Sequence, residues 1–216
     1  MASATIDEIT VSGEPESWAA LGFTVADGVC RLGAVQLRFT GSRADPDQGI
    51  LGWALRDIAS DALDGLPTTV SRAAIGDRAE EHPNGVLAID HVVAMSADLQ
   101  RTVEALTAAG LDLRRIREEP TAAGAPRQAF FRLGGEILEV VQEPQEVVER
   151  GGGPDRPTRF WGLALLVADL DASAAVFAPQ LGTIRPAVQP GRRIATVKRT
   201  AALSVPVALI DSAPRA

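Results

Sequence analysis

His91 and Glu139 are the two polar residues of this sequence whose types and surroundings best suit chemistry. Each stands within an apolar segment, AIDHVVAM for His91 and EILEVVQ for Glu139, and both segments predict β-strands. Because alternate residues of a strand share a face, we expect His91 to share a face with Ile89 and Val93. A carboxylate buried alone is costly, so Glu139 needs a partner, and His91 is the simplest one.

Three interpretations of this pair are open on the sequence alone. A neutral imidazole and a carboxylate are sound ligands for a divalent ion, so the pair could be half of a metal site that water, substrate or another carboxylate completes. The same groups could work without metal, as an acid/base pair or as hydrogen-bonding partners of a substrate. They could also form a purely structural hydrogen-bonded pair.

Residues on a neighbouring segment could complete a small-molecule site. The segment 127–133 predicts a strand on which Gln128, Phe130 and Arg132 share one face. If that face lines a cleft, Gln128 could orient a carbonyl or a water molecule, and Arg132 could hold a carboxylate with two hydrogen bonds. The alternative is a solvated face of an edge strand. Trp161 could form an apolar wall suited to a planar ligand, or could pack in the core.

The elements that must position these residues follow one pattern twice. Between Gly85 and Glu143 the sequence predicts a β-α-β-β-β order, with a strand at 88–95, a helix at 98–109 and strands at 111–117, 127–133 and 136–142. A connector rich in Gly and Pro follows at 143–157. The same order then recurs, with a strand at 160–167, a helix at 169–178 and strands at 183–188, 193–198 and 205–210.

The first 80 residues repeat the pattern more faintly. The letters IDEI echo IDHV, which places Glu8 where His91 stands, and Leu37-Arg38 matches Leu138-Glu139. The letters ILGWAL echo the strand that contains Trp161. We therefore expect an α+β fold of four modules in two pairs. The predicted division is a degenerate pair at 1–80 and a second pair at 86–216, with modules at 86–143 and 158–211.

The segment 88–141 resembles the glyoxalase, bleomycin-resistance and extradiol-dioxygenase superfamily, also called vicinal oxygen chelate proteins. The resemblance is carried by IDHVVAMSADLQRTVEALTAAGL, RQAFFRLGG and EILEVV. It implies paired βαβββ modules whose strands curl into open, barrel-like sheets around a cleft. Over residues 159–211 the resemblance is fair, and over the first 80 residues it is weak.

In that superfamily one metal ligand comes from the first strand of a module and one from its last strand. The matching positions here are His91 and Glu139, so the resemblance implies that they bind one divalent metal ion. The fourth module offers Gly162 and Ala208, which have no ligating side chain. Glu8 is a third candidate ligand if the first module faces the third. A site without metal is the alternative.

The composition and charge of the chain argue against several kinds of partner and location. The chain has 28 acidic and 21 basic residues and a formal net charge of -7, which disfavours nucleic acid as a partner. No apolar stretch is long enough to span a membrane, and the start of the sequence is unlike a secretory signal, so we expect a cytoplasmic protein. A single cysteine excludes an intramolecular disulfide.

The resemblance implies a lyase or isomerase that acts on a small organic molecule beside a carbonyl or an enolate. His91 would bind metal or act as the base, and Glu139 would be its ligand partner or the proton acceptor. The alternative is a metal-free protein that sequesters a hydrophobic metabolite or antibiotic. In the bleomycin-resistance branch the ligand commonly lies at a dimer interface, so this alternative implies a homodimer.

Overall fold

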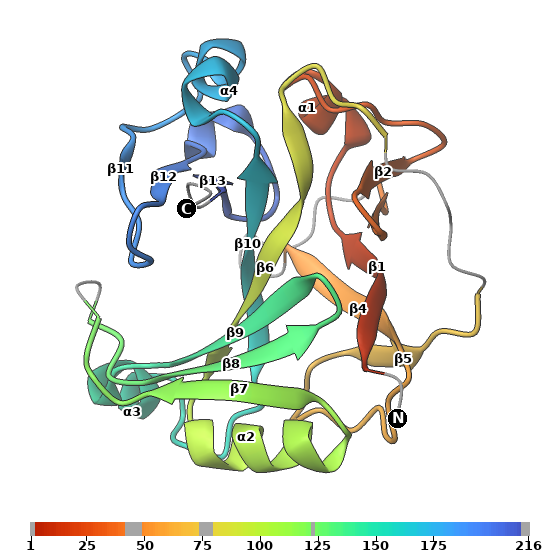
Figure 1. The fold of residues 1–216 in the computed structure, drawn as a ribbon. Coiled ribbons are helices and arrows are strands. Elements are labelled where there is room, and N and C mark those ends of the chain that lie inside the picture. Colours follow the sequence, from red (N-terminus) through yellow and green to blue (C-terminus); the bar gives the residue numbers. More distant parts are fainter. Residues whose placement is uncertain (1–2, 42–48, 74–79, 122–123, 213–216) are drawn as a thin grey trace.

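Two mixed β-sheets make up the centre of the molecule, in a computed structural model that describes residues 3–41, 49–73, 80–121 and 124–212 (Figure 1). One sheet has five strands in the order β2-β3-β1-β4-β5, and the other has eight in the order β11-β12-β13-β10-β6-β9-β8-β7. The fold is α+β, as expected. Both sheets are open, and the described residues contain no closed barrel.

The strands of the five-stranded sheet are β1 (Thr5–Val11), β2 (Val29–Leu32), β3 (Val35–Phe39), β4 (Ile50–Arg56) and β5 (Thr68–Val70). Those of the eight-stranded sheet are β6 (Val86–Ser96), β7 (Asp112–Arg117), β8 (Gln128–Leu133), β9 (Glu136–Gln142), β10 (Arg159–Val167), β11 (Arg185–Pro186), β12 (Arg193–Thr196) and β13 (Val207–Asp211). The helices are α1 (Pro15–Ala19), α2 (Leu99–Ala108), α3 (Gln145–Arg150) and α4 (Leu170–Phe177), with a 3₁₀ turn at Arg199–Ala201.

The eight-stranded sheet consists of two similar halves. Strands β6 and β10 pair antiparallel at its centre, with Val92 opposite Leu163. In each half the last strand lies parallel to the first, β9 beside β6 and β13 beside β10. The element order β6-α2-β7-β8-β9 is followed by β10-α4-β11-β12-β13, which agrees with the repeat read from the sequence.

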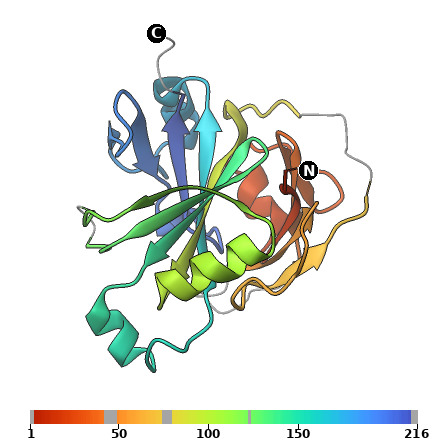
Figure 2. The ribbon, with the colours of Figure 1, turned by 60° about the horizontal axis from the view of Figure 1, so that its bottom comes forward.

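Local sequence explains the two longer helices. The side chain of Asp98 accepts a hydrogen bond from the backbone N–H of Arg101, and Asp169 caps α4 in the same way. Leu99, Val103 and Leu106 recur at helical spacing and are buried. They cover one face of β7, β8 and β9, across which α2 lies in Figure 2.

The five-stranded sheet is a reduced version of the same plan. Its central pair, β1 and β4, is also antiparallel, and β3 and β5 lie parallel to their first strands. The described part of the first module has β1, α1, β2 and β3, and that of the second has only β4 and β5.

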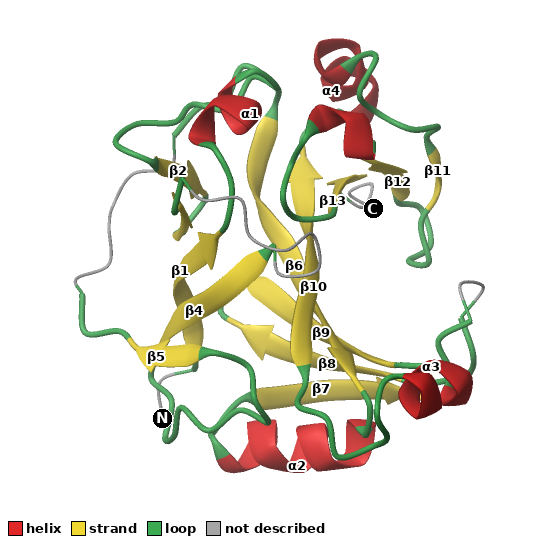
Figure 3. Ribbon diagram, turned by 180° about the vertical axis from the view of Figure 1, so that it is seen from behind, coloured by secondary structure: helices red, strands yellow, loops and turns green. Residues whose placement is uncertain are grey.

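One apolar cluster runs through both sheets, from Ala4 near the N-terminus to Leu209 in β13. Strands β4 and β10 lie against each other where the sheets meet (Figure 3). There the rings of Trp53 and Phe160 pack edge to face with their centres 5.0 Å apart. Trp53 therefore packs in the core, whereas Trp161, the next residue along β10, is 49% exposed.

The predicted connector at 143–157 contains the short helix α3. Glu143 is buried at its start and pairs with Arg156 and Arg159, so the connector is held at both ends. Among the described residues, no helix is long and apolar enough to cross a membrane.

Candidate functional site

Two irregularities in the central strand pair place the candidate site. His91 lies opposite Ala164 and Ile89 opposite Leu165, so Asp90 has no residue facing it. In the same way Trp161 has no partner between Phe160 and Gly162. Each extra residue makes a β-bulge, a feature that re-aims side chains and is common beside active sites. Asp90 and Trp161 occupy matching places in their two modules.

The bulge at Asp90 changes which residues share a face. Ile89 and Val92 both lie in the main core, although regular alternation would put them on opposite faces. The expectation that His91 shares a face with Ile89 is therefore wrong, because the extra residue turns the strand between them. The expectation for Val93 is right, since His91 and Val93 line the same cavity.

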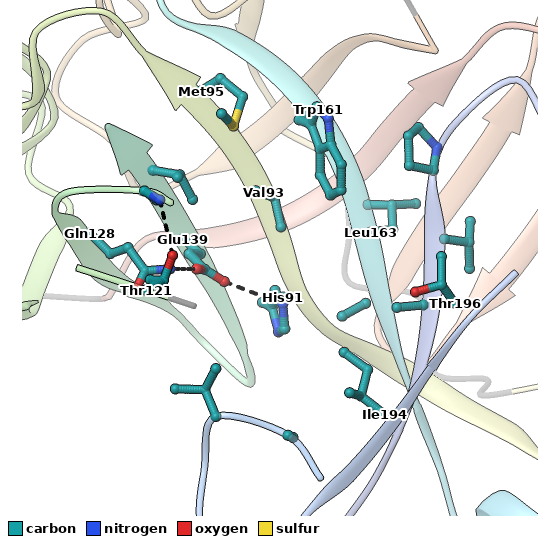
Figure 4. A pocket seen from close by; sticks show the side chains of 18 of the residues that line it. His91, Val93, Met95, Thr121, Gln128, Glu139, Trp161, Leu163, Ile194 and Thr196 are labelled. Carbon is teal, nitrogen blue, oxygen red and sulfur yellow. Dashed lines mark hydrogen bonds and ion pairs between the residues drawn. The ribbon is translucent and has the colours of Figure 1, made fainter. Parts of the chain in front are cut away.

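That cavity has a volume of about 720 Å³ and lies between the two halves of the eight-stranded sheet (Figure 4). Its wall is mostly apolar and includes Val93, Met95, Val141, Leu163 and Ile194. The side chains of His91, Gln128 and Glu139 form its main polar group. A largely apolar cavity with a few converging polar groups is typical of small-molecule sites.

The polar residues of this wall belong to a chain of contacts that continues beneath it. Gln128 Nε2 donates a hydrogen bond to Glu139 Oε1, and Glu139 Oε2 lies 3.4 Å from His91 Nε2. On its other side, His91 Nδ1 lies 2.8 Å from Asp90 Oδ2. Arg192, in the turn between β11 and β12, donates to Asp90 Oδ1 at 2.5 Å and to the carbonyl of Asp211 at 2.7 Å. His91 is thus held between two carboxylates.

The two carboxylates have opposite pKa shifts. Burial alone would raise the pKa of Asp90, but hydrogen bonds from His91 and Arg192 lower it overall, so Asp90 is ionised. Burial raises the pKa of Glu139, and the negative charge of Asp90 raises it further, against the opposing effect of His91. A pair of neighbouring groups with pKa values moved apart is typical of acid/base sites.

The donors present do not fit a resident metal ion. Catalytic metal sites generally keep three protein ligands and an open position. No three His, Cys, Asp or Glu side chains in the described ranges come close enough to share an ion. Val93 pairs with Glu139, and its counterpart Ala164 pairs with Ala208, so the position that matches Glu139 has no ligating side chain. Gly162, at the position of His91, has none either.

The other residues singled out from the sequence are placed as follows. Gln128 and Trp161 line the cavity with His91 and Glu139. Phe130 and Arg132 lie farther along β8, outside the cavity lining: the Arg115 guanidinium stacks over the Phe130 ring, and Arg132 donates to the carbonyl of Gly134.

Glu8 lies in the five-stranded sheet. It accepts a hydrogen bond from Arg38 Nε at 2.8 Å, and so it does not join His91 and Glu139.

Sequence reasoning missed Asp90 and Arg192. Asp90 carried one signal, a charged residue next to a histidine inside an apolar strand. The contact of Arg192 with Asp90 could not be predicted, because it depends on the pairing of β6, β10, β13 and β12 and not on any local pattern.

No protein-family model and no curated protein matches this sequence. Solved structures do match. Methylmalonyl-CoA epimerase from Mycobacterium tuberculosis is 23% identical over 60% of this chain and 91% of its own, with a TM-score of 0.48. A variant of the Streptomyces coelicolor epimerase in complex with 2-nitronate-propionyl-CoA is 21% identical over 60% and 96%, with a TM-score of 0.47.

A third match, methylmalonyl-CoA epimerase in complex with methylmalonyl-CoA and NH4+, is 21% identical over 58% of this chain and 94% of its own, with a TM-score of 0.46. The paired β-α-β-β-β order of the eight-stranded sheet follows from this chain's own strand pairing. This order is the one that the resemblance of segment 88–141 to the vicinal oxygen chelate superfamily implies.

Proposed function

We propose that this protein catalyses proton transfer at a carbon atom next to a carbonyl group of a small, largely apolar molecule, as an isomerase or a lyase does. The observation that carries the proposal is the His91–Glu139 pair. Its two titratable groups lie 3.4 Å apart in the wall of a mostly apolar cavity. The chemistry assigned to them needs no metal ion.

The neighbours of His91 and Glu139 determine which of their atoms carry protons. Ionised Asp90 can only accept hydrogen bonds, so Nδ1 of His91 carries a proton and Nε2 is the nitrogen left to exchange one. Nε2 faces Glu139 at 3.4 Å, and burial raises the pKa of that carboxyl group, so a proton on Glu139 lies within reach of the ring. In the charged form of the pair, Glu139 is a base and His91 is a hydrogen-bond donor.

These two groups suit the two ends of an enolisation. Atoms 3.4 Å apart can reach the α-hydrogen and the carbonyl oxygen of one molecule together. Glu139 takes the α-proton while Nε2–H of His91 donates to the oxygen, where negative charge develops. Return of the proton to another face or atom gives an isomer. Departure of a group from the next carbon gives an alkene, which is the lyase outcome.

Deuterium exchange tests this proposal without a known substrate. Ketones, 1,3-diketones and 2-oxoacids are incubated with the protein in D2O, and α-deuteration is followed by proton NMR. We expect enzyme-dependent exchange with at least one class, reduced roughly 100-fold or more by Glu139→Gln and by His91→Ala. The matched control is Glu104→Gln, on the exposed face of α2, which should leave exchange unchanged.

A binding role is the second candidate, and one observation favours it. Glu139 already has partners in Gln128 and His91, so the polar group is satisfied without a ligand. A sequestering protein would bind an apolar compound in this cavity with no exchange above background. Its affinity would also survive Glu139→Gln. That pair of results would replace the catalytic proposal with the binding one.

A further inference from the structure

A second cavity of about 700 Å³ opens beside the first. The N-terminal module contributes Gly13, Glu14 and Ser17 to its lining, and the fourth module contributes β12, the 3₁₀ turn and the start of β13. Its wall is more polar than that of the first cavity. It lies outside the group formed by His91, Glu139 and Gln128.

The two cavities share a wall made of Trp161, Thr196, Pro206 and Val207. Trp161 occupies the bulge in β10 and is 49% exposed, so its indole stands between them in the open. The wall is firmly built. The Pro206 carbonyl accepts a hydrogen bond from the backbone of Leu163, and a Cβ on Gly162 would lie only 2.7 Å from the same oxygen.

The charges of the two cavities differ. The second contains Lys198, the only lysine of the chain, and Arg199, with Glu14 as its acidic residue. Lys198 donates to the carbonyl of Pro179 and keeps two further N–H groups for other acceptors. Arg199 makes no side-chain hydrogen bond or ion pair with the described residues. In a chain of net charge -7, two adjacent cations beside a cavity are a local feature that the overall charge does not explain.

We propose that the second cavity binds the far end of the same ligand, and that this end carries an anionic group held by Lys198 and Arg199. The ligand is then elongated, with its reacting carbonyl at His91 and Glu139, its apolar middle against Trp161, and its anion in the second cavity. This inference rests on the proposed function, because it gives the ligand of that site a second part.

Two matched ketones test it. Nonan-2-one and 8-oxononanoate have the same carbonyl end and the same methylene chain, and differ only in a terminal methyl group or carboxylate. Their binding to the full chain is measured by titration calorimetry at low and high salt. We expect the carboxylate to bind about tenfold more tightly at low salt, and this preference to shrink at high salt. The double variant Lys198→Gln/Arg199→Gln should lose the preference while binding nonan-2-one as the wild type does.

Arg185→Gln is the matched control, because Arg185 is the basic residue in the lining of the first cavity. If that variant removes the preference and the double variant does not, the anion lies in the first cavity and the inference is overturned. Equal binding of the two ketones to the wild type, or no binding of either, overturns it as well.

Deuterium exchange separates this inference from the proposed function. Exchange of both ketones with no preference for the carboxylate would refute the inference alone. A preference that depends on Lys198 and Arg199, without exchange of any carbonyl compound, would refute the catalytic proposal alone.

Discussion

The central strand pair of each sheet contains a β-bulge at an aspartate, and the two bulges have different surroundings. In the five-stranded sheet a bulge leaves Asp7 unpaired between Ile6 and Glu8, just as Asp90 is unpaired between Ile89 and His91. The carboxylate of Asp7 accepts hydrogen bonds from Arg56 and Ser71, and that of Asp90 from Arg192. In both pairs an arginine neutralises the bulged aspartate.

The residues beside the bulge differ. Thr10 pairs with Arg38 as Val93 pairs with Glu139, so the Glu8–Arg38 ion pair stands where His91 and Glu139 stand in the other sheet. Glu8 and Arg38 are 23% and 46% exposed, against 19% for His91 and 16% for Glu139. In the first pair a carboxylate and a guanidinium form a hydrogen-bonded ion pair, and the guanidinium stays protonated. In the second pair an imidazole faces a carboxyl group whose pKa is raised by burial, so both groups are of the kind that transfers protons.

The largest effect on activity is expected when the side chains of the Glu8–Arg38 pair replace those of His91 and Glu139. The double variant His91→Glu/Glu139→Arg has the charges of Glu8 and Arg38 and the same register. It should fold, because the new groups can form an ion pair, but α-proton exchange should fall roughly 100-fold or more, since neither group can exchange a proton near neutral pH. Circular dichroism checks the fold and NMR the exchange. Retained exchange would show that chemistry resides elsewhere.

Substitutions of the two aspartates at the bulges, Asp7 and Asp90, should affect stability and activity differently. Asp7→Asn should lower the free energy of unfolding by about 2 kcal/mol, because it weakens charged hydrogen bonds to Arg56, whose Nε and Nη1 are buried without partners among the described residues. Asp90→Asn should cost less, since Arg192 keeps Gln189 and the carbonyl of Asp211. Urea unfolding of both variants measures the difference.

On activity the order should reverse. Asp90→Asn replaces an acceptor with an amide that can donate to Nδ1, so the proton of His91 is no longer fixed on that nitrogen. Exchange should fall roughly tenfold or more with little change in ligand affinity, as when a group that orients an active histidine is removed. Asp7→Asn should leave the exchange rate of the folded protein unchanged. A loss of exchange in both variants would mean that the two bulges are not functionally distinct.

Only part of the fold and of the candidate site can be predicted from the sequence. The strands and helices follow from periodicity, which depends on residues near in the chain. The match of Glu8 with His91 follows from the repeated letters IDEI and IDHV. The pairing of His91 with Glu139 was expected from the cost of a lone buried carboxylate. The bulge at Asp90 was not, because it depends on how β6 meets β10. The contact of Asp90 with Arg192 depends in turn on that register. The second cavity depends on where the first module meets the fourth.

The smallest effect expected is a difference in how stability depends on pH. The pKa of Glu139 is raised on folding, so the folded state favours its protonated form. Its stability contribution is full below the ordinary carboxyl pKa and is lost as pH rises through the folded value. Glu139→Gln, which cannot ionise, should therefore gain stability relative to the wild type as pH rises from about 4 to about 8.

Asp90 has the opposite sign, because its pKa is lowered on folding. Its contribution is present above the ordinary aspartate pKa and is lost as pH falls through the folded value, so Asp90→Asn should differ least from the wild type in acid. Urea unfolding from about pH 4 to about pH 8 checks the slope for Glu139→Gln, and unfolding below about pH 4 checks the slope for Asp90→Asn. Slopes of the same sign for the two variants would contradict the opposed protonation of the two carboxylates that hold His91, and with it the reason for placing an acid and a base in this pair.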